Sequence, residues 1–187
     1  MEVYVSLLRG INISGQKIIK MVDLQASYLR LGVQQAATYI QSGNVVFRGE
    51  RLECVAWAAR ISAQLKVDFG FEIAVVVLSV EQLAAMIAAE PFSKRAGIDL
   101  AMVYYAFFAA TPAVFDGAAI AAMSKNGEEV VFAENVAYLH YPNGYGRAKF
   151  SNNFLEAQLK IRATTRNWRT TTRLLEMAQA MQADAPL

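Results

Sequence analysis

An apolar run followed by a glycine-bracketed polar segment stands near the start of the chain, Val3-Tyr4-Val5-Ser6-Leu7-Leu8-Arg9-Gly10-Ile11-Asn12-Ile13-Ser14-Gly15-Gln16-Lys17. Its first part, Val3 to Leu8, is apolar enough for a buried strand, and an amphipathic segment from Lys20 to Leu31 follows the stretch. Between them, Gly10 and Gly15 bracket a loop whose backbone can turn with its N–H groups facing inward. The stretch therefore predicts a strand, an anion-binding loop and a helix start.

The side chains of this loop also suit an anion. No acid lies between Val3 and Val22. The spacing is close to the phosphate-binding pattern G-x-x-x-x-G-K-[ST], but Gln16 stands where the lysine is required, Lys17 falls one place late, and Ile18 follows it in place of the magnesium-binding hydroxyl. We therefore interpret the loop as an anion site and not as part of an NTPase; the alternative is a tight turn whose polar groups only satisfy the backbone. The side-chain donors are Arg9, Asn12, Ser14 and Lys17.

Composition limits the chemistry that the chain can perform. With 187 residues, 55% hydrophobic and 18% charged, the chain can bury one sizeable core or two small adjoining ones. Cys54 is the only cysteine and His140 the only histidine, which excludes an intrachain disulfide and the usual zinc and non-haem iron ligand sets. We expect no metal and no cofactor, and we expect Cys54 to be a buried structural thiol because it lies on an apolar helical face.

The location of the protein follows from its apolar segments. Met1-Glu2 leads directly into the strand pattern, without the basic region and apolar core of a signal peptide, and the longest apolar run, Leu100 to Ala110, is too short to span a bilayer. The chain is therefore predicted to be cytoplasmic and without a membrane partner. Its net charge of +2 is weak evidence for a nucleic-acid partner, so the distribution of the basic residues matters more.

Hydrophobic periodicity predicts the elements of the first half. Ser42-Gly43-Asn44 is a hairpin signal between two short β-rich runs. The expected order is a strand at 3–8, a helix over 20–31, strands at 38–41 and 45–48, a helix over 54–69 and a strand at 73–78. This β-α-β-β-α-β order is the split βαβ of ferredoxin-like folds.

The second half has a similar pattern. Thr111-Pro112 is expected to start a helix, as a cap and a first-turn proline. We expect a helix ending near 89, a polar linker near 90–97, a strand at 100–109, a helix over 114–123, hairpin strands at 129–133 and 136–141, and helices over 151–160 and 166–181. The prediction is an α+β protein of two ferredoxin-like (split βαβ) subdomains with antiparallel sheets and a C-terminal helix, divided into residues 1–79 and 80–187.

Three further segments are rich in glycine, asparagine, threonine and basic residues and contain no acid: Thr38 to Asn44, Asn143 to Lys149 and Thr164 to Thr172. In the second, Arg147 and Lys149 could point at a ligand near the next helix N-terminus. The third is expected to begin a helix, with Arg166 at its N-terminus. Residues 144 to 173 include seven basic residues and only one acidic residue. This imbalance favours a phosphate-bearing partner, although such a run of charges usually forms a solvent-exposed surface.

Three motifs together resemble the bacterial family known as domain of unknown function 1697: Leu7-Leu8-Arg9-Gly10-Ile11-Asn12, Thr38-Tyr39-Ile40-Gln41-Ser42-Gly43-Asn44-Val45-Val46-Phe47 and Thr165-Arg166-Asn167-Trp168. They fall near the start, in the first hairpin and near the end, so the resemblance covers essentially the whole chain. It implies a cytoplasmic α+β protein with two ferredoxin-like subdomains. It implies no established activity, substrate or cofactor.

Three functions remain open from the sequence. The first is a module that binds a phosphate-bearing ligand, either a nucleotide or a nucleic-acid backbone. The second is a metal-independent transferase or hydrolase that uses the same basic groups to stabilise an oxyanion, although no base is visible; His140 is either that base or a ring packed on the sheet. The third is a structural protein or homo-oligomer. The expected ligand-binding residues are Arg9, Gly10, Asn12, Gly15, Lys17, Ser42, Gly43, Asn44, Arg147, Lys149, Thr165, Arg166 and Asn167.

Overall fold

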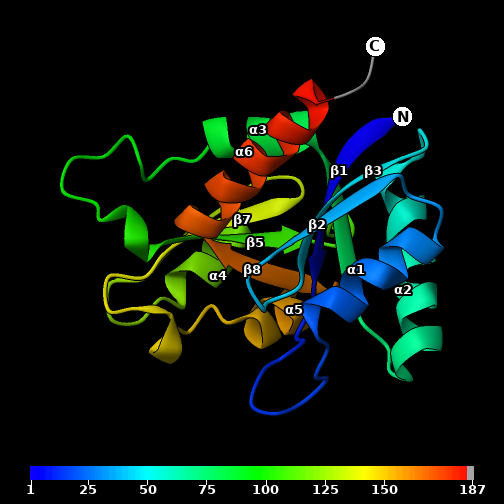
Figure 1. The fold of residues 1–187 in the computed structure, drawn as a ribbon. Coiled ribbons are helices and arrows are strands. Elements are labelled where there is room, and N and C mark those ends of the chain that lie inside the picture. Colours follow the sequence, from blue (N-terminus) through cyan, green and yellow to red (C-terminus); the bar gives the residue numbers. More distant parts are fainter. Residues whose placement is uncertain (185–187) are drawn as a thin grey trace. The chain divides into compact units, whose positions relative to one another are not determined.

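The computed structural model describes residues 1–184, and the chain divides into two compact units (Figure 1). Unit 1 comprises Met1–Ala85 and Arg173–Leu187, and unit 2 comprises Met86–Thr172. Helices α3 (Val80–Ala88) and α6 (Trp168–Ala183) each have residues in both units. The subdomain boundary expected between residues 79 and 80 stays a prediction.

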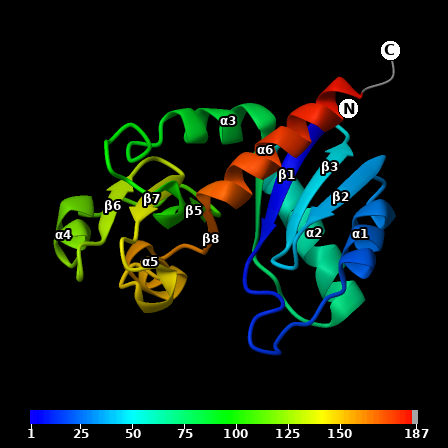
Figure 2. The ribbon, with the colours of Figure 1, turned by 60° about the vertical axis from the view of Figure 1, so that its left-hand side comes forward.

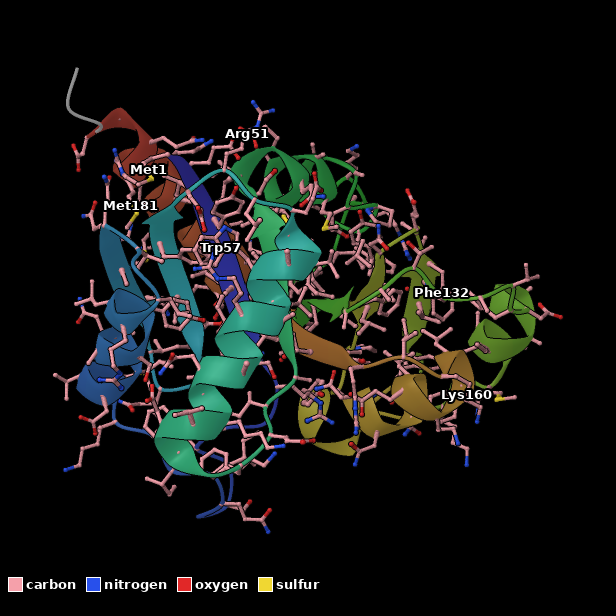
Figure 3. The ribbon with its side chains drawn as sticks, turned by 90° about the vertical axis from the view of Figure 1, so that its right-hand side faces the viewer. Met1, Arg51, Trp57, Phe132, Lys160 and Met181 are labelled. Carbon is pink, nitrogen blue, oxygen red and sulfur yellow. The ribbon has the colours of Figure 1, made fainter. Side chains whose placement is uncertain are left out.

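Unit 1 contains the predicted β-α-β-β-α-β order. Its elements are β1 (Glu2–Leu8), α1 (Met21–Arg30), β2 (Gln35–Tyr39), β3 (Asn44–Gly49), α2 (Cys54–Phe69) and β4 (Val75–Ser79). The sheet order is β2-β3-β1-β4 and all neighbours are antiparallel, so β3 lies between β2 and β1 as a split βαβ unit requires. Figure 3 shows α1 and α2 on the same face of this sheet.

An aromatic cluster centred on Phe47 fills the space between this sheet and its helices. The Phe47 ring centroid lies 5.4 Å from that of Tyr4, 5.5 Å from that of Tyr28 and 5.1 Å from that of Trp57. All four rings are almost completely buried. Strand alternation places Tyr4 and Phe47 on the helix side, and helices α1 and α2 supply Tyr28 and Trp57. The unit therefore has a core of its own.

Unit 2 repeats the same topology. Its elements are β5 (Val103–Phe108), α4 (Gly117–Ala122), β6 (Glu129–Phe132), β7 (Val136–His140), α5 (Asn152–Leu159) and β8 (Ala163–Asn167). The sheet order is β6-β7-β5-β8, again with antiparallel neighbours. The predicted fold class, two split βαβ subdomains with antiparallel sheets and a C-terminal helix, is confirmed.

The expected helix start at Thr164 is wrong, because residues 163–167 form the strand β8. This strand pairs with β5, whose aromatic, apolar sequence makes it the centre of the sheet. Two adjacent threonines in β8 are β-branched and fit a strand better than a first helical turn. The last helix begins at Trp168, after Asn167, whose Oδ1 accepts a hydrogen bond of 2.8 Å from the backbone N–H of Thr170. The second half therefore has its own last strand.

Two other boundaries differ from the expectation because aspartates act as caps. Asp116 accepts a hydrogen bond from the backbone N–H of Ala119 and starts α4 at Gly117, whereas Thr111 bonds to Asn135. Asp99 accepts from the backbone N–H of Ala101, so 100–102 form a 3-10 turn and the strand begins at 103. The expected helix and strand exist, but both are shorter.

Gly43 occupies a position where both the backbone conformation and the space exclude a side chain. Its φ is +73°, and a Cβ atom there would lie 2.7 Å from Leu8 Cβ and 2.9 Å from Ile11 Cδ1. Gly70, at the end of α2, has a similar φ of +78° but open space around it. Gly70 is therefore required only for its left-handed backbone conformation, whereas Gly43 is required both for its conformation and for the absence of a side chain.

We predict that Gly70→Ala lowers the free energy of unfolding by about 1–2 kcal/mol, the usual penalty for a left-handed residue with a Cβ. Gly43→Ala should lower the free energy of unfolding by about 1–3 kcal/mol more than Gly70→Ala, because the added Cβ would overpack the site. Urea unfolding of the full chain measures both variants. Equal losses would contradict the close packing of Gly43 on Leu8 and Ile11.

Candidate functional site

The predicted anion-binding loop joins β1 to α1 and is exposed at one edge of unit 1, beside the turn between β2 and β3 (Figure 2). Its backbone is unusual, since five of its residues have positive φ: Gly10 (69°), Asn12 (55°), Ser14 (50°), Gly15 (76°) and Lys17 (47°). A left-handed conformation costs about 1–2 kcal/mol in residues other than glycine, with asparagine the most tolerant. The loop therefore needs interactions that hold it.

The side chain of Asn12 supplies those interactions. Its Nδ2 donates to the backbone carbonyl of Ile19 at 2.9 Å and to that of Gln41 at 2.8 Å. Its Oδ1 accepts from the backbone N–H of Ile19 at 2.8 Å. The first and third bonds close the loop on itself, and the second joins it to the β2–β3 turn. Asn12 is therefore a structural tie within the edge.

The β2–β3 turn is strained as well. Ile40 has a φ of +48°, which is a genuine outlier for a β-branched residue. The Asn44 side chain is buried and donates from Nδ2 to the backbone carbonyl of Tyr39 at 3.0 Å and to Ser42 Oγ at 3.1 Å. Gly43 accepts at its carbonyl from the backbone N–H of Leu8 at 2.8 Å. Ser42, Gly43 and Asn44 thus shape the turn.

Backbone strain is concentrated at this edge. Among residues 1–184, six residues other than glycine have positive φ, and four of them are Asn12, Ser14, Lys17 and Ile40. Strained backbone persists only where the surrounding structure enforces it, and it clusters at functional sites. The concentration makes this edge the candidate site.

The charges at the edge are mixed. Lys17 Nζ donates to the backbone carbonyl of Glu72 at 2.6 Å and lies 5.8 Å from the centroid of the Phe71 ring. The pKa of the Glu72 carboxyl is lowered, first by Lys66 and then by Lys17. Lys20 is exposed at the start of α1, which has no side-chain cap. The loop has no acid of its own, but the fold brings Glu72 beside it.

The expected site residues of the 143–149 segment lie in unit 2. The side chain of Arg147 is outside the described part of the structure. Lys149 donates its backbone N–H to both carboxylate oxygens of Glu128, at 2.9 and 3.0 Å, and its Nζ lies 4.6 Å from the centroid of the Phe154 ring. Glu128 is buried. A carboxylate from another segment therefore anchors this connection, which the local acid count could not reveal.

Thr165, Arg166 and Asn167 also lie in unit 2, at β8. Thr165 Oγ1 donates to Asn152 Oδ1 at 2.7 Å. Arg166 is 8% exposed, and its Nη1 donates to Thr164 Oγ1 and to the Thr165 carbonyl, each at 2.8 Å. Arg166 thus sits in a strand, paired with Tyr105, and the expectation that it stands at a helix N-terminus is wrong. Asn167 caps α6.

The loop residues Arg9, Gly10, Asn12, Gly15 and Lys17 and the turn residues Ser42, Gly43 and Asn44 all lie in unit 1, where Asn12 bonds to Gln41 and Leu8 bonds to Gly43. The remaining five expected residues lie in unit 2. That all of them serve one ligand stays a prediction.

The other reactive side chains have local partners. His140 Nδ1 lies 3.3 Å from Glu129 Oε1, and its ring packs on that of Phe92 at a centroid distance of 5.7 Å. Arg95 lowers the pKa of the Glu129 carboxyl, with a smaller contribution from His140. Cys54 is half-buried and not fully buried as expected, and desolvation raises the pKa of its thiol.

The described residues also bear on metals and membranes. No group of three histidine, cysteine, aspartate or glutamate side chains within residues 1–184 is arranged to hold a metal ion. In the same part of the chain, no helix combines the length and the apolar character that a bilayer crossing needs.

The family model described as "Protein of unknown function (DUF1697)" matches residues 1–138. The chain belongs to this family. Its fold is shared by the solved structure of the conserved bacterial protein SP0830 from Streptococcus pneumoniae, with a TM-score of 0.71 and 22% identity over 94% of this chain and 98% of that one. No curated protein matches the chain. The predicted DUF1697 resemblance is confirmed.

In this DUF1697 chain, we predict that Asn12→Ala lowers the free energy of unfolding by about 2–4 kcal/mol, because three hydrogen bonds worth about 1 kcal/mol each are lost at a left-handed residue. Urea unfolding measures the change, and faster exchange of the Ile19 amide hydrogen should accompany it. Asn143→Ala is the control, since Asn143 Nδ2 makes one exposed bond to the Asn126 carbonyl. A loss no greater than that of the control would show that Asn12 does not hold the edge.

Proposed function

We propose that the edge of unit 1 formed by residues 9–20 and 40–44 binds a phosphate-bearing ligand, a nucleotide or a nucleic-acid backbone, without a divalent metal. The observation that supports this function is the concentration of left-handed, non-glycine residues in a loop that Asn12 holds in place. A structural loop of this length could use glycine at each such position at no steric penalty. Keeping Ser14 and Lys17 there favours a role for their side chains.

The exposed groups of the loop suit an anion. Ser14, Gly15 and Gln16 are exposed at its tip, and Lys17 and Lys20 flank the entry to α1. The first turn of α1 has no side-chain cap, so its backbone N–H groups can take a ligand oxygen, and the helix dipole favours negative charge there. These donors come from one continuous stretch of chain, which allows them to act on one phosphate.

The acids near the edge set the strength of the interaction. Glu72 lies beside Lys17, and Asp23 lies in the first turn of α1. Both reduce the net positive potential, so we expect moderate affinity that weakens as salt is added. The groups at the edge that would contact the ligand are cations and N–H donors, which is why the proposal needs no magnesium ion.

The test is a calorimetric titration of the full chain with ATP, inorganic pyrophosphate and a short single-stranded oligonucleotide, with and without a chelator. We predict that Lys17→Gln/Lys20→Gln weakens binding of the ligand that wild type prefers by about 10- to 100-fold, the effect of losing a charge-assisted hydrogen bond. Lys125→Gln/Lys160→Gln is the matched control, because it removes the same charge from exposed lysines in unit 2.

Three outcomes would contradict the proposal. If none of the three ligands bound, the chain would not have the proposed phosphate-binding function. Equal weakening in both double variants would show that only net charge matters. Binding that the chelator abolishes would show that a metal is required.

A further inference from the structure

A second feature of unit 1, separate from the strained edge, is a buried arginine near the end of the buried strand β3. Arg48 lies in β3 opposite Val3 of β1, on the sheet face that does not carry the aromatic cluster. It is 7% exposed. Burial of a guanidinium is costly unless the charge is paired and its N–H groups are bonded. The partners of Arg48 therefore decide what the residue is for.

Those partners are incomplete. Nη2 donates to the backbone carbonyl of Met181 in α6. Nε is buried and has no hydrogen-bond partner among the described residues. None of the ion pairs formed within residues 1–184 includes Arg48. A buried cation with a neutral carbonyl and no carboxylate is short of one negative charge.

Arg48 lines a cavity of about 250 Å³ at the end of unit 1 where Met1 and Met181 lie (Figure 3). The polar side chains around it come from four other elements: Glu2 in β1, Ser79 at the end of β4, Glu81 at the start of α3 and Gln182 in α6. The pKa of the Glu81 carboxyl is lowered, first by a bond from its own backbone N–H and then by Ser79 and Gln182. The cavity therefore has a buried guanidinium inside, the ionised, exposed carboxylate of Glu81 at its rim, and the carboxylate of Glu2, which pairs with Arg51.

We propose that this cavity binds a small α-amino acid, with the ligand carboxylate on Arg48 and its ammonium group toward Glu81. The planar fork of a guanidinium matches a carboxylate with two parallel bonds, and a ligand carboxylate would supply the negative charge that Arg48 lacks. Glu81 attracts a cationic group and repels a second negative charge, which separates this ligand class from phosphates. The volume lies below the roughly 300–1,000 Å³ of sites for drug-sized ligands, so the ligand is small.

The test follows backbone amide shifts of the ¹⁵N-labelled full chain during titration with glycine, acetate and methylammonium. Glycine should give saturable shifts at Val3, Ser79 and Gln182. It should also bind more tightly than acetate or methylammonium, each of which carries only one of its two charged groups. Arg48→Met should weaken glycine binding by about 10- to 100-fold, the effect of losing a charge-assisted hydrogen bond. This variant is expected to fold, because replacing a buried unpaired charge by an apolar chain is often neutral or stabilising.

Two further variants sharpen the result. Arg30→Met is the matched control, since the Arg30 side chain is 51% exposed and pairs with Asp68, away from the residues that line the cavity, and it should leave glycine binding unchanged. Glu81→Gln, at an exposed position, should weaken the binding of glycine but not that of acetate, and it tests the proposal independently of the Arg48 variant. Acetate binding as tight as glycine binding, glycine binding unaffected by Arg48→Met, or no saturable shift at the cavity would each overturn the proposal.

Discussion

The three hydrogen bonds of the Asn12 carboxamide hold the exposed edge of unit 1 in a conformation that its backbone would not otherwise keep. Without them, a loop with left-handed residues at Ser14 and Lys17 would relax, since each costs about 1–2 kcal/mol. The bond to Gln41 also couples the loop to a turn that carries its own outlier, Ile40. The edge is therefore one structural feature made of two segments that are distant in the sequence.

This arrangement separates the polar motif residues into two groups. Asn12, Gly43 and Asn44 shape the backbone, through bonds and close contacts inside the edge. Lys17 and Lys20, by contrast, are exposed and carry the charge. Sequence motifs that look like one binding site can thus consist mostly of residues that position a few others. The proposed ligand contacts are fewer than the expected list.

Most of the fold could be predicted because its periodic signals are strong. The split βαβ order of unit 1 was predicted from the helical periodicity of apolar residues over 20–31 and 54–69 and from the hairpin signal Ser42-Gly43-Asn44. Strand β8 was missed because its threonines, arginine and asparagine are also typical of a helix start, and only pairing with β5 decides between the two. The start of α4 was misplaced because Asp116 competes with Thr111 as a cap.

The candidate site was harder to predict, for an electrostatic reason. A count of acids along a segment cannot reveal Glu72 beside Lys17 or Glu128 beneath Lys149, because both carboxylates come from other segments. Arg48 did leave a signal, a basic residue in phase with Val46 in an apolar strand, but only the buried, incomplete bonding of its guanidinium shows what that signal means. The cytoplasmic location and a homo-oligomer stay predictions.

Whether the strained edge of unit 1 is an anion site can be tested by titrating the ¹⁵N-labelled full chain with inorganic pyrophosphate and following every backbone amide. We expect the largest shifts at residues 14–18, in the exposed part of the loop, and at Met21 and Val22, at the start of α1 that has no side-chain cap. The Ile19 amide, which is bonded to Asn12, should keep its slow hydrogen exchange throughout. Shifts that are largest outside residues 9–23 and 40–44, with the loop amides unmoved, would contradict the claim that this strained edge is an anion site.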